Sequence, residues 1–332
     1  MNIEHDTRLT SAEISYLWSV YISDTMSICV FKYFLLHIED QNIKVLAEHA
    51  LDLSQQHIKT VEGIFTDGGI PIPKGFTEED VNLKAERLFS DIFCVYYMKN
   101  MVALGISNAS ITLPYIFRDD ILSFNTKNLH STIELNNEIT QVFLEKGLAI
   151  RPPYVPYPPD VEFVHKQSFI LEMLGKRPLT ALESTCLFTN SLTNNIGACI
   201  SAAFAQVAKS KEVKQYFLRG QEISTKHVKI FIDYLEKHSL PITIPLAINQ
   251  DVTTSTESPF SDKLLMYHHL LMNRSGVSNY GVTISSCVRS DLVIDFTRLT
   301  AEILKFAEDG LNILIDNDWF ERPPLASYRK KE

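Results

Sequence analysis

Carboxylate, amide and imidazole side chains at two related sets of positions could hold a metal ion or a small ligand. The first set is Asp24, His57 and Glu138, and the second, Asn194, His227 and Asp309, follows about 170 residues later. Two or three carboxylate and imidazole ligands suit a divalent metal ion. The same groups could instead form an internal hydrogen-bond network, because buried polar groups need partners. Both interpretations stay open, and Asn108 and Asn279 are predicted to lie near the same level of each half.

A complete di-iron site would need more than these residues. In four-helix bundles such a site uses a Glu from each of two helices and a Glu-x-x-His pair from each of the other two, because positions three apart share a helix face. Of the ten histidines, only His165 follows a Glu, Glu162, at that spacing, and this pair lies in a proline-rich segment. The sequence therefore predicts no confident metal site and no cofactor, with a divalent metal as the alternative.

Motifs of known catalytic chemistry are also missing from the sequence. It contains no Gly-rich phosphate loop, no G-x-S-x-G and no H-E-x-x-H. The adjacent His268 and His269 would point about 100° apart on a helix, which does not suit chelation of one ion. Since no acid, base or nucleophile is assembled, we expect no catalytic residue and favour a protein that is not an enzyme.

An internal duplication explains why the two sets of polar residues match. The chain aligns with itself at an offset of 170 residues, which becomes 171 after one inserted residue, and about a fifth of aligned positions are identical. The matched segments include Ile70-Pro71-Ile72 with Leu240-Pro241-Ile242, Phe89-Ser90-Asp91 with Phe260-Ser261-Asp262, and Arg151-Pro152-Pro153 with Arg322-Pro323-Pro324. The sequence is therefore a tandem repeat.

Each repeat is predicted to form four helices. In the first repeat, apolar residues recur at helical spacing over 14–35, 45–64, 92–111 and 121–143. A stretch of about twenty residues, rich in Pro, Gly and acidic side chains, separates the second and third runs, and Ser90 resembles an N-cap. Two helix hairpins joined by one long crossover have the connectivity of ferritin-like bundles. The predicted fold is all-α, with two tandem ferritin-like four-helix bundles in up-down-down-up order.

The predicted domain organisation follows from the repeat. Residues 9–150 form the first bundle, 151–178 a linker and 179–325 the second bundle. Five prolines between 151 and 159 oppose helix formation and favour an extended, semi-rigid spacer.

Composition limits the partners and the compartment. The net charge is −9, and residues 1–160 carry 12 Lys and Arg against 21 Asp and Glu, which argues against nucleic-acid partners. Five cysteines without C-x-x-C spacing support neither a disulfide framework nor a zinc site. No uninterrupted apolar run reaches about 18 residues, and the first residues lack a signal-peptide pattern. We expect a cytoplasmic protein without membrane insertion.

Several motifs point to one family. They are Glu13-Ile14 with Leu17-Trp18, Ala50-Leu51-Asp52-Leu53-Ser54 before His57, Ile70-Pro71-Ile72-Pro73, Leu88-Phe89-Ser90-Asp91, Phe217-Leu218-Arg219-Gly220, and Glu321-Arg322-Pro323-Pro324. Together they resemble a tandem ferritin-like family of unknown function from endospore-forming bacilli, which is similar to spore coat proteins. The resemblance covers roughly 9–325 and implies the fold, but no activity.

Three functions remain as hypotheses. The preferred one is a non-catalytic structural or interaction protein, spore-associated, whose partners are other spore proteins or copies of itself. The second is a ferritin-like metal-binding protein or oxidoreductase with a degenerate site. The third is a small-molecule binding module with a cavity at the inward polar level.

Overall fold

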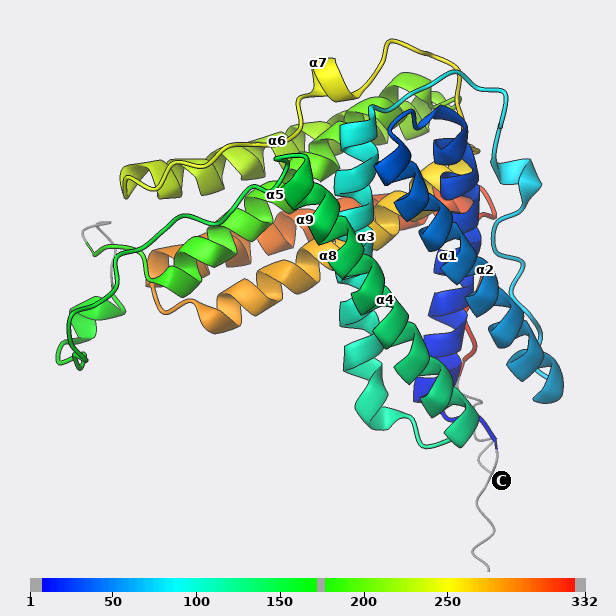
Figure 1. Ribbon diagram of the computed structural model, residues 1–332, viewed down its shortest axis with the longest axis horizontal. Helices are drawn as coiled ribbons and strands as arrows, with labels where there is room; N and C mark the ends of the chain where they lie inside the picture. Colours follow the sequence, from blue (N-terminus) through cyan, green and yellow to red (C-terminus); the bar gives the residue numbers. More distant parts are fainter. Residues whose placement is uncertain (1–7, 172–176, 326–332) are drawn as a thin grey trace, which may run out of the picture.

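The computed structural model describes residues 8–171 and 177–325, and these residues form an all-helical protein (Figure 1). The predicted all-α class is therefore confirmed. Strand-like pairing within the described residues is limited to two isolated bridges. The helices are α1 (Ser11–His37), α2 (Gln41–Asp67), α3 (Asp91–Thr112), α4 (Asp119–Glu145), α5 (Ala181–Val207), α6 (Lys211–Lys237), α7 (Ile248–Asp251), α8 (Asp262–Ser286) and α9 (Ser290–Asp316), with 3-10 turns η1 (Glu78–Asp80), η2 (Leu113–Tyr115) and η3 (Gln167–Phe169).

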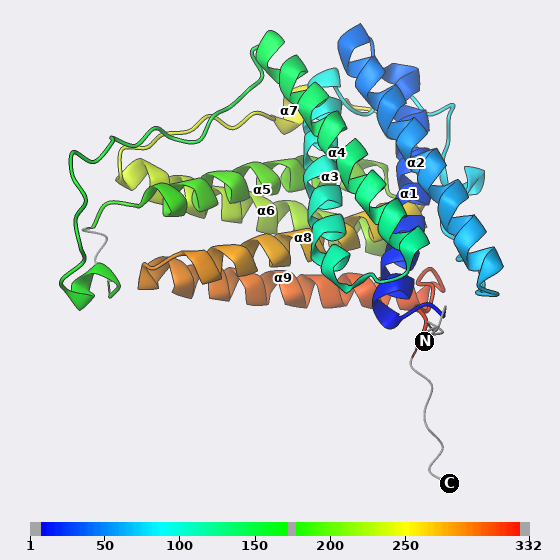
Figure 2. The ribbon, with the colours of Figure 1, turned by 60° about the horizontal axis from the view of Figure 1, so that its bottom comes forward.

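Each half consists of two helix hairpins and a long crossover. The hairpins α1–α2 and α3–α4 make the first half, α5–α6 and α8–α9 make the second, and residues 68–90 and 238–261 cross over between them. Figures 1 and 2 show the first group of helices standing across the second rather than continuing it end to end. The short helix α7 lies in the second crossover and was not predicted. Residues 172–176 of the predicted linker lie outside the described residues.

The first helix of each half is anchored at its start by a buried glutamate. Thr10 caps α1, and the Glu13 carboxylate accepts the backbone N–H of Thr10 at 2.8 Å and that of Arg118 at 3.0 Å. One side chain thus satisfies two free helix-end donors and ties α1 to the corner before α4. The same arrangement recurs at Thr180, Glu183 and Arg289.

Each crossover supplies a carboxylate that accepts a hydrogen bond from the cap serine of the other half. The hydroxyl of Ser90, which caps α3, donates to Asp251 Oδ1 at 2.6 Å. Reciprocally, the hydroxyl of Ser261, which caps α8, donates to Asp80 Oδ1 at 2.7 Å. The isolated bridges are reciprocal as well, because Val81 pairs with Phe260 and Val252 with Phe89. The halves are therefore related by an approximate two-fold axis.

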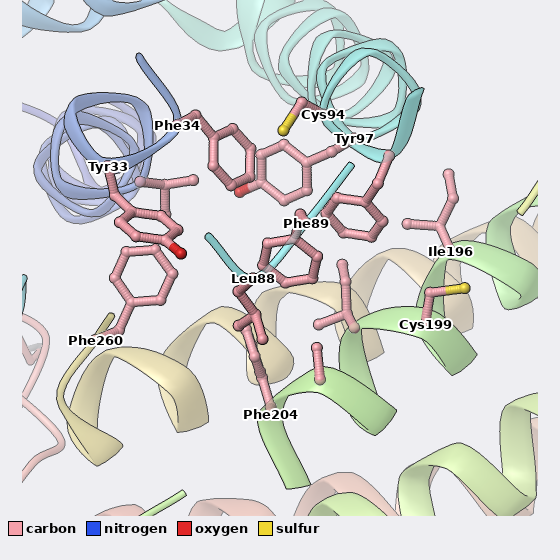
Figure 3. Packing of buried hydrophobic residues seen from close by; sticks show 14 of the residues in the cluster. Tyr33, Phe34, Leu88, Phe89, Cys94, Tyr97, Ile196, Cys199, Phe204 and Phe260 are labelled. Carbon is pink, nitrogen blue, oxygen red and sulfur yellow. The ribbon is translucent and has the colours of Figure 1, made fainter. Parts of the chain in front are cut away.

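One hydrophobic cluster belongs to both halves. It contains side chains of α1, α3, α5 and α8 and of both crossovers, and Figure 3 labels members of this cluster at the junction. Tyr33 packs edge-on against Phe260 with ring centroids 5.4 Å apart, and Phe89 lies between the helices of the two halves. A further cluster lies within each half alone. The sequence left the packing between the bundles open, and the structure joins them through a common core.

Helix α1 is the most apolar segment of the junction. By length and composition it could cross a membrane, and 61% of its apolar window is buried inside the protein. A helix that is hydrophobic on most of its circumference suits the centre of a large core.

Candidate functional site

The structure brings two of the predicted site residues together in the first half. His57 Nδ1 on α2 lies 3.0 Å from Asp24 Oδ2 on α1, and Ser54 Oγ donates to Asp24 Oδ1 at 3.1 Å. The Asp24 and His57 side chains are only 18% and 13% exposed. Because an ionised carboxylate only accepts hydrogen bonds, His57 carries its proton on Nδ1.

Glu138 and Asp309 do not join these sites. Glu138 Oε2 pairs with His49 Nδ1 at 2.7 Å, and Asp309 pairs with Arg219 at the equivalent place in the second half, also at 2.7 Å. His49 lies eight residues before His57 on the same helix, which is about 12 Å along its axis. The structure therefore separates Glu138 from the predicted set of Asp24 and His57.

In the second half, the equivalent polar groups are linked by a tyrosine. Asn194 Nδ2 donates to the Tyr280 hydroxyl at 2.9 Å, and that hydroxyl lies 2.9 Å from His227 Nδ1. His227 Nε2 lies 3.0 Å from Glu302 Oε2. Burial lowers the pKa of His227, although hydrogen bonding and charge attraction from Glu302 oppose this shift. The network here is satisfied by protein atoms.

Tyr280 and Glu302 complete this network, and the sequence comparison missed both of them. The comparison selected positions that are alike in the two repeats, whereas Tyr280 corresponds to Ala109 and Glu302 to Ser131. A signal was nonetheless present in the sequence. Tyr280 directly follows Asn279, which matches Asn108, and it aligns with the much smaller Ala109.

A cavity of about 390 Å³ lies beside Asp24 and His57 in the first half. Helices α1 to α4 and the crossing helix α8 supply its walls. Its polar wall includes Asp24, Ser54, His57 and Asn108, and its lining is mainly apolar elsewhere. Ala109, which is 2% exposed, also lines it.

Helix α8 contributes two buried polar side chains to the cavity lining. His268 Nε2 lies 2.8 Å from the Tyr97 hydroxyl, its counterpart in the other repeat, and burial lowers the pKa of His268 to about 4. His268 Nδ1 and Ser275 Oγ are buried with no hydrogen-bond partner among the described residues. Buried polar atoms usually have a hydrogen-bond partner, so each of these two atoms has the capacity for one further hydrogen bond.

Across residues 8–171 and 177–325, no group of three or more His, Cys, Asp or Glu side chains is placed to hold a metal ion. The five cysteines, all in this part of the chain, are free and buried.

The fold and the cavity define a duplicated, all-helical protein whose halves share one core. A family model described as "Protein of unknown function (DUF3231)" matches residues 1–161 and again residues 168–331. The chain belongs to this family, and the two matches support the predicted duplication. No curated protein matches the chain. Among solved structures, a crystal structure described as a putative spore coat protein from Bacillus halodurans C-125 is 18% identical, with a TM-score of 0.41, and the similarity covers 45% of this chain and 97% of that one.

Proposed function

We propose that the protein is a non-catalytic binding protein for a small, mainly apolar molecule. The observation that carries this proposal is the cavity of about 390 Å³ in the first half. Its volume falls within the range of small-molecule sites, roughly 300–1,000 Å³. A mainly apolar lining with a few convergent polar groups is also typical of such sites.

The hydrogen bonds at Asp24 favour binding over hydrolysis. A nucleophilic serine needs its hydroxyl hydrogen-bonded to the base that removes its proton. In the described structure Ser54 donates instead to the carboxylate of Asp24, and His57 donates to the other oxygen of that carboxylate. These groups are therefore arranged as a buried acceptor with two fixed donors.

A thermal-shift assay with a cavity-filling variant tests this function. The wild type is heated with toluene, indole or naphthalene, and it should gain a few °C because a ligand at 100 times its Kd adds about 2.7 kcal/mol of stability. Ala109→Phe should remove the shift, whereas the exposed helix control Ala103→Phe should keep it. No shift with any compound, or an unchanged shift in Ala109→Phe, would refute the assignment.

A second candidate function is the structural or interaction role that the sequence predicts. It is favoured by the linker, where Tyr154, Tyr157, Val161 and Phe163 are each at least 79% exposed. Exposed apolar patches often mark contact sites. Replacing these four by Ser should abolish self-association, measured by light scattering on a sizing column, if this role is correct. Recovery of the protein from spores of sporulating cells would support the proposed spore association.

The ferritin-like origin of each half is also part of the proposal. It is supported by the two hairpins and the long crossover in each half. Elemental analysis of untagged protein tests the alternative of a degenerate metal site. Less than about a tenth of an equivalent of iron, manganese or zinc would remove that alternative, whereas occupancy lost in His57→Ala would establish it.

A further inference from the structure

One position of the bundle carries side chains of very different size in the two halves. Helices α3 and α8 align residue by residue at an offset of 171, with Gly105 on Gly276 and Asn108 on Asn279, so that Ala109 aligns with Tyr280. Tyr280 is fully buried and packs edge-on against Phe296, with centroids 5.2 Å apart. The ring of Tyr280 therefore occupies the interior of the second bundle.

In the first half, the cavity lies where the repeat predicts this ring. Ala109, Asp24 and His57 are the counterparts of Tyr280, Asn194 and His227, and all three line the cavity. A methyl group stands where the second half has a phenol. The buried Tyr16, whose counterpart in the second half is Cys186, also lines the cavity, and its hydroxyl accepts a hydrogen bond from Asn128 Nδ2 at 3.1 Å.

We propose that the cavity of the first half binds a phenol, an aromatic ring with a free hydroxyl that takes the place of the Tyr280 side chain. The proposal rests on the binding function and names its ligand class. The ligand ring lies beside Ala109, and its hydroxyl reaches Asp24.

Because the Asp24 carboxylate only accepts hydrogen bonds, the part of the ligand that contacts it should be a hydrogen-bond donor. In the second half Asn194 donates to the Tyr280 oxygen. Because Glu302 faces Nε2 of neutral His227, that nitrogen carries the proton and Nδ1 accepts from the phenol. Asp24 has only acceptors, and two of its roughly four acceptor sites are taken by Ser54 and His57. A ligand O–H can use a remaining site, in a charge-assisted bond about twice as strong as a neutral one.

The apolar lining independently favours an aromatic ring. Four of the seven methionines of the chain line the cavity: Met26, Met98, Met101 and Met272. Thioether sulfur makes favourable contacts with aromatic rings, and the flexible methionine side chain adapts to irregular ligands.

Calorimetric titration of the full chain with three related probes tests the proposal. They are p-cresol, its methyl ether 4-methylanisole, which cannot donate, and toluene, which lacks the oxygen. We expect p-cresol to bind wild type at least tenfold more tightly than either. Asp24→Asn, which copies the second half, should reduce this preference severalfold. Ala109→Tyr, which supplies the phenol covalently, should abolish binding and raise Tm.

The second half provides a matched gain of function. Tyr280→Ala should open an equivalent cavity, so that p-cresol binds at two sites per chain instead of one. If this variant is too unstable to purify, the comparison of p-cresol with 4-methylanisole on wild type still decides the ligand class.

The results of these titrations distinguish the proposed phenol ligand from the more general proposal that the cavity binds a small apolar molecule. Equal affinity for p-cresol and toluene would overturn the ligand class and leave the binding function standing. A preference for p-cresol that persists in Asp24→Asn would overturn the assigned contact. Failure of all three probes, together with no thermal shift from indole or naphthalene, would overturn both proposals.

Discussion

Acid should destabilise the fold through two buried histidines of α8. His269 is 3% exposed, and its Nε2 lies 2.9 Å from Ser201 Oγ. Burial, reinforced by the neighbouring His268, lowers the pKa of His269 to about 3, and burial lowers that of His268 to about 4. Both values lie below the roughly 6.5 of an unfolded histidine.

The direction and size of the effect follow from proton linkage. Because the folded pKa is depressed, the unfolded chain binds more protons below pH 6.5. The free energy of unfolding is therefore highest above that pH and falls as the pH approaches the folded values. At pH 5 each of these two histidines should cost about 2 kcal/mol relative to pH 7, or about 4 kcal/mol together.

Urea unfolding at pH 7, 6 and 5, followed by circular dichroism, measures this loss. His269→Met copies Met98, the counterpart in the first repeat, and should reduce the loss between pH 7 and pH 5 by about 2 kcal/mol. The substitution also removes the hydrogen-bond partner of Ser201, which should lower the free energy of unfolding by about 1–3 kcal/mol at each pH. This effect should leave the difference between pH 7 and pH 5 unchanged. The exposed control His130→Met should keep the wild-type dependence. A loss in His269→Met as large as in wild type would refute the reasoning.

Two further predictions concern the junction and the helix packing. Asp80→Ala and Asp251→Ala each remove the carboxylate that accepts the hydroxyl of a cap serine in the opposite half, and each should lower the free energy of unfolding by about 1–3 kcal/mol in urea titrations. An effect of only one of the two variants would contradict the approximate two-fold symmetry. Gly310→Ala should destabilise by about 1–3 kcal/mol, because its Cβ would lie 2.7 Å from Tyr216 Cζ, whereas Gly63→Ala, on an open helix surface, should raise Tm with a gain of up to about 1 kcal/mol. Equal effects of the two alanines would contradict the packing described for α9.

Local patterns were sufficient to predict the long helices. The apolar run over 92–111 became α3, Asp91–Thr112, because its spacing and its Ser90 cap act within one segment. The short α7 has no such pattern. It is a single turn whose Asp251 accepts the backbone N–H of Ala247 and the hydroxyl of Ser90 from the other half. A contact between distant segments cannot be inferred from the periodicity of either.

The candidate site was predictable only where the repeats agree. Asp24 and His57 were selected because similar residues recur 170 positions later, and they form a hydrogen-bonded pair. Glu138 met the same criterion, but its place along α4 puts it opposite His49. The cavity depends on a difference, Ala109 against Tyr280, and its size depends on how four helices and α8 enclose it. Volume and enclosure are properties of the packed structure, which residue matching does not measure.

The reciprocal hydrogen bonds between the two crossovers have an evolutionary consequence. In a symmetric dimer of two identical chains, every substitution would occur twice, once on each side of the two-fold axis. A covalent fusion removes that constraint, since each copy then mutates alone. In the second copy, the buried ring of Tyr280 fills the centre of the bundle, and its hydroxyl is hydrogen-bonded to Asn194. The other copy, which has Ala109 at the equivalent position, was then free to diverge in its interior packing.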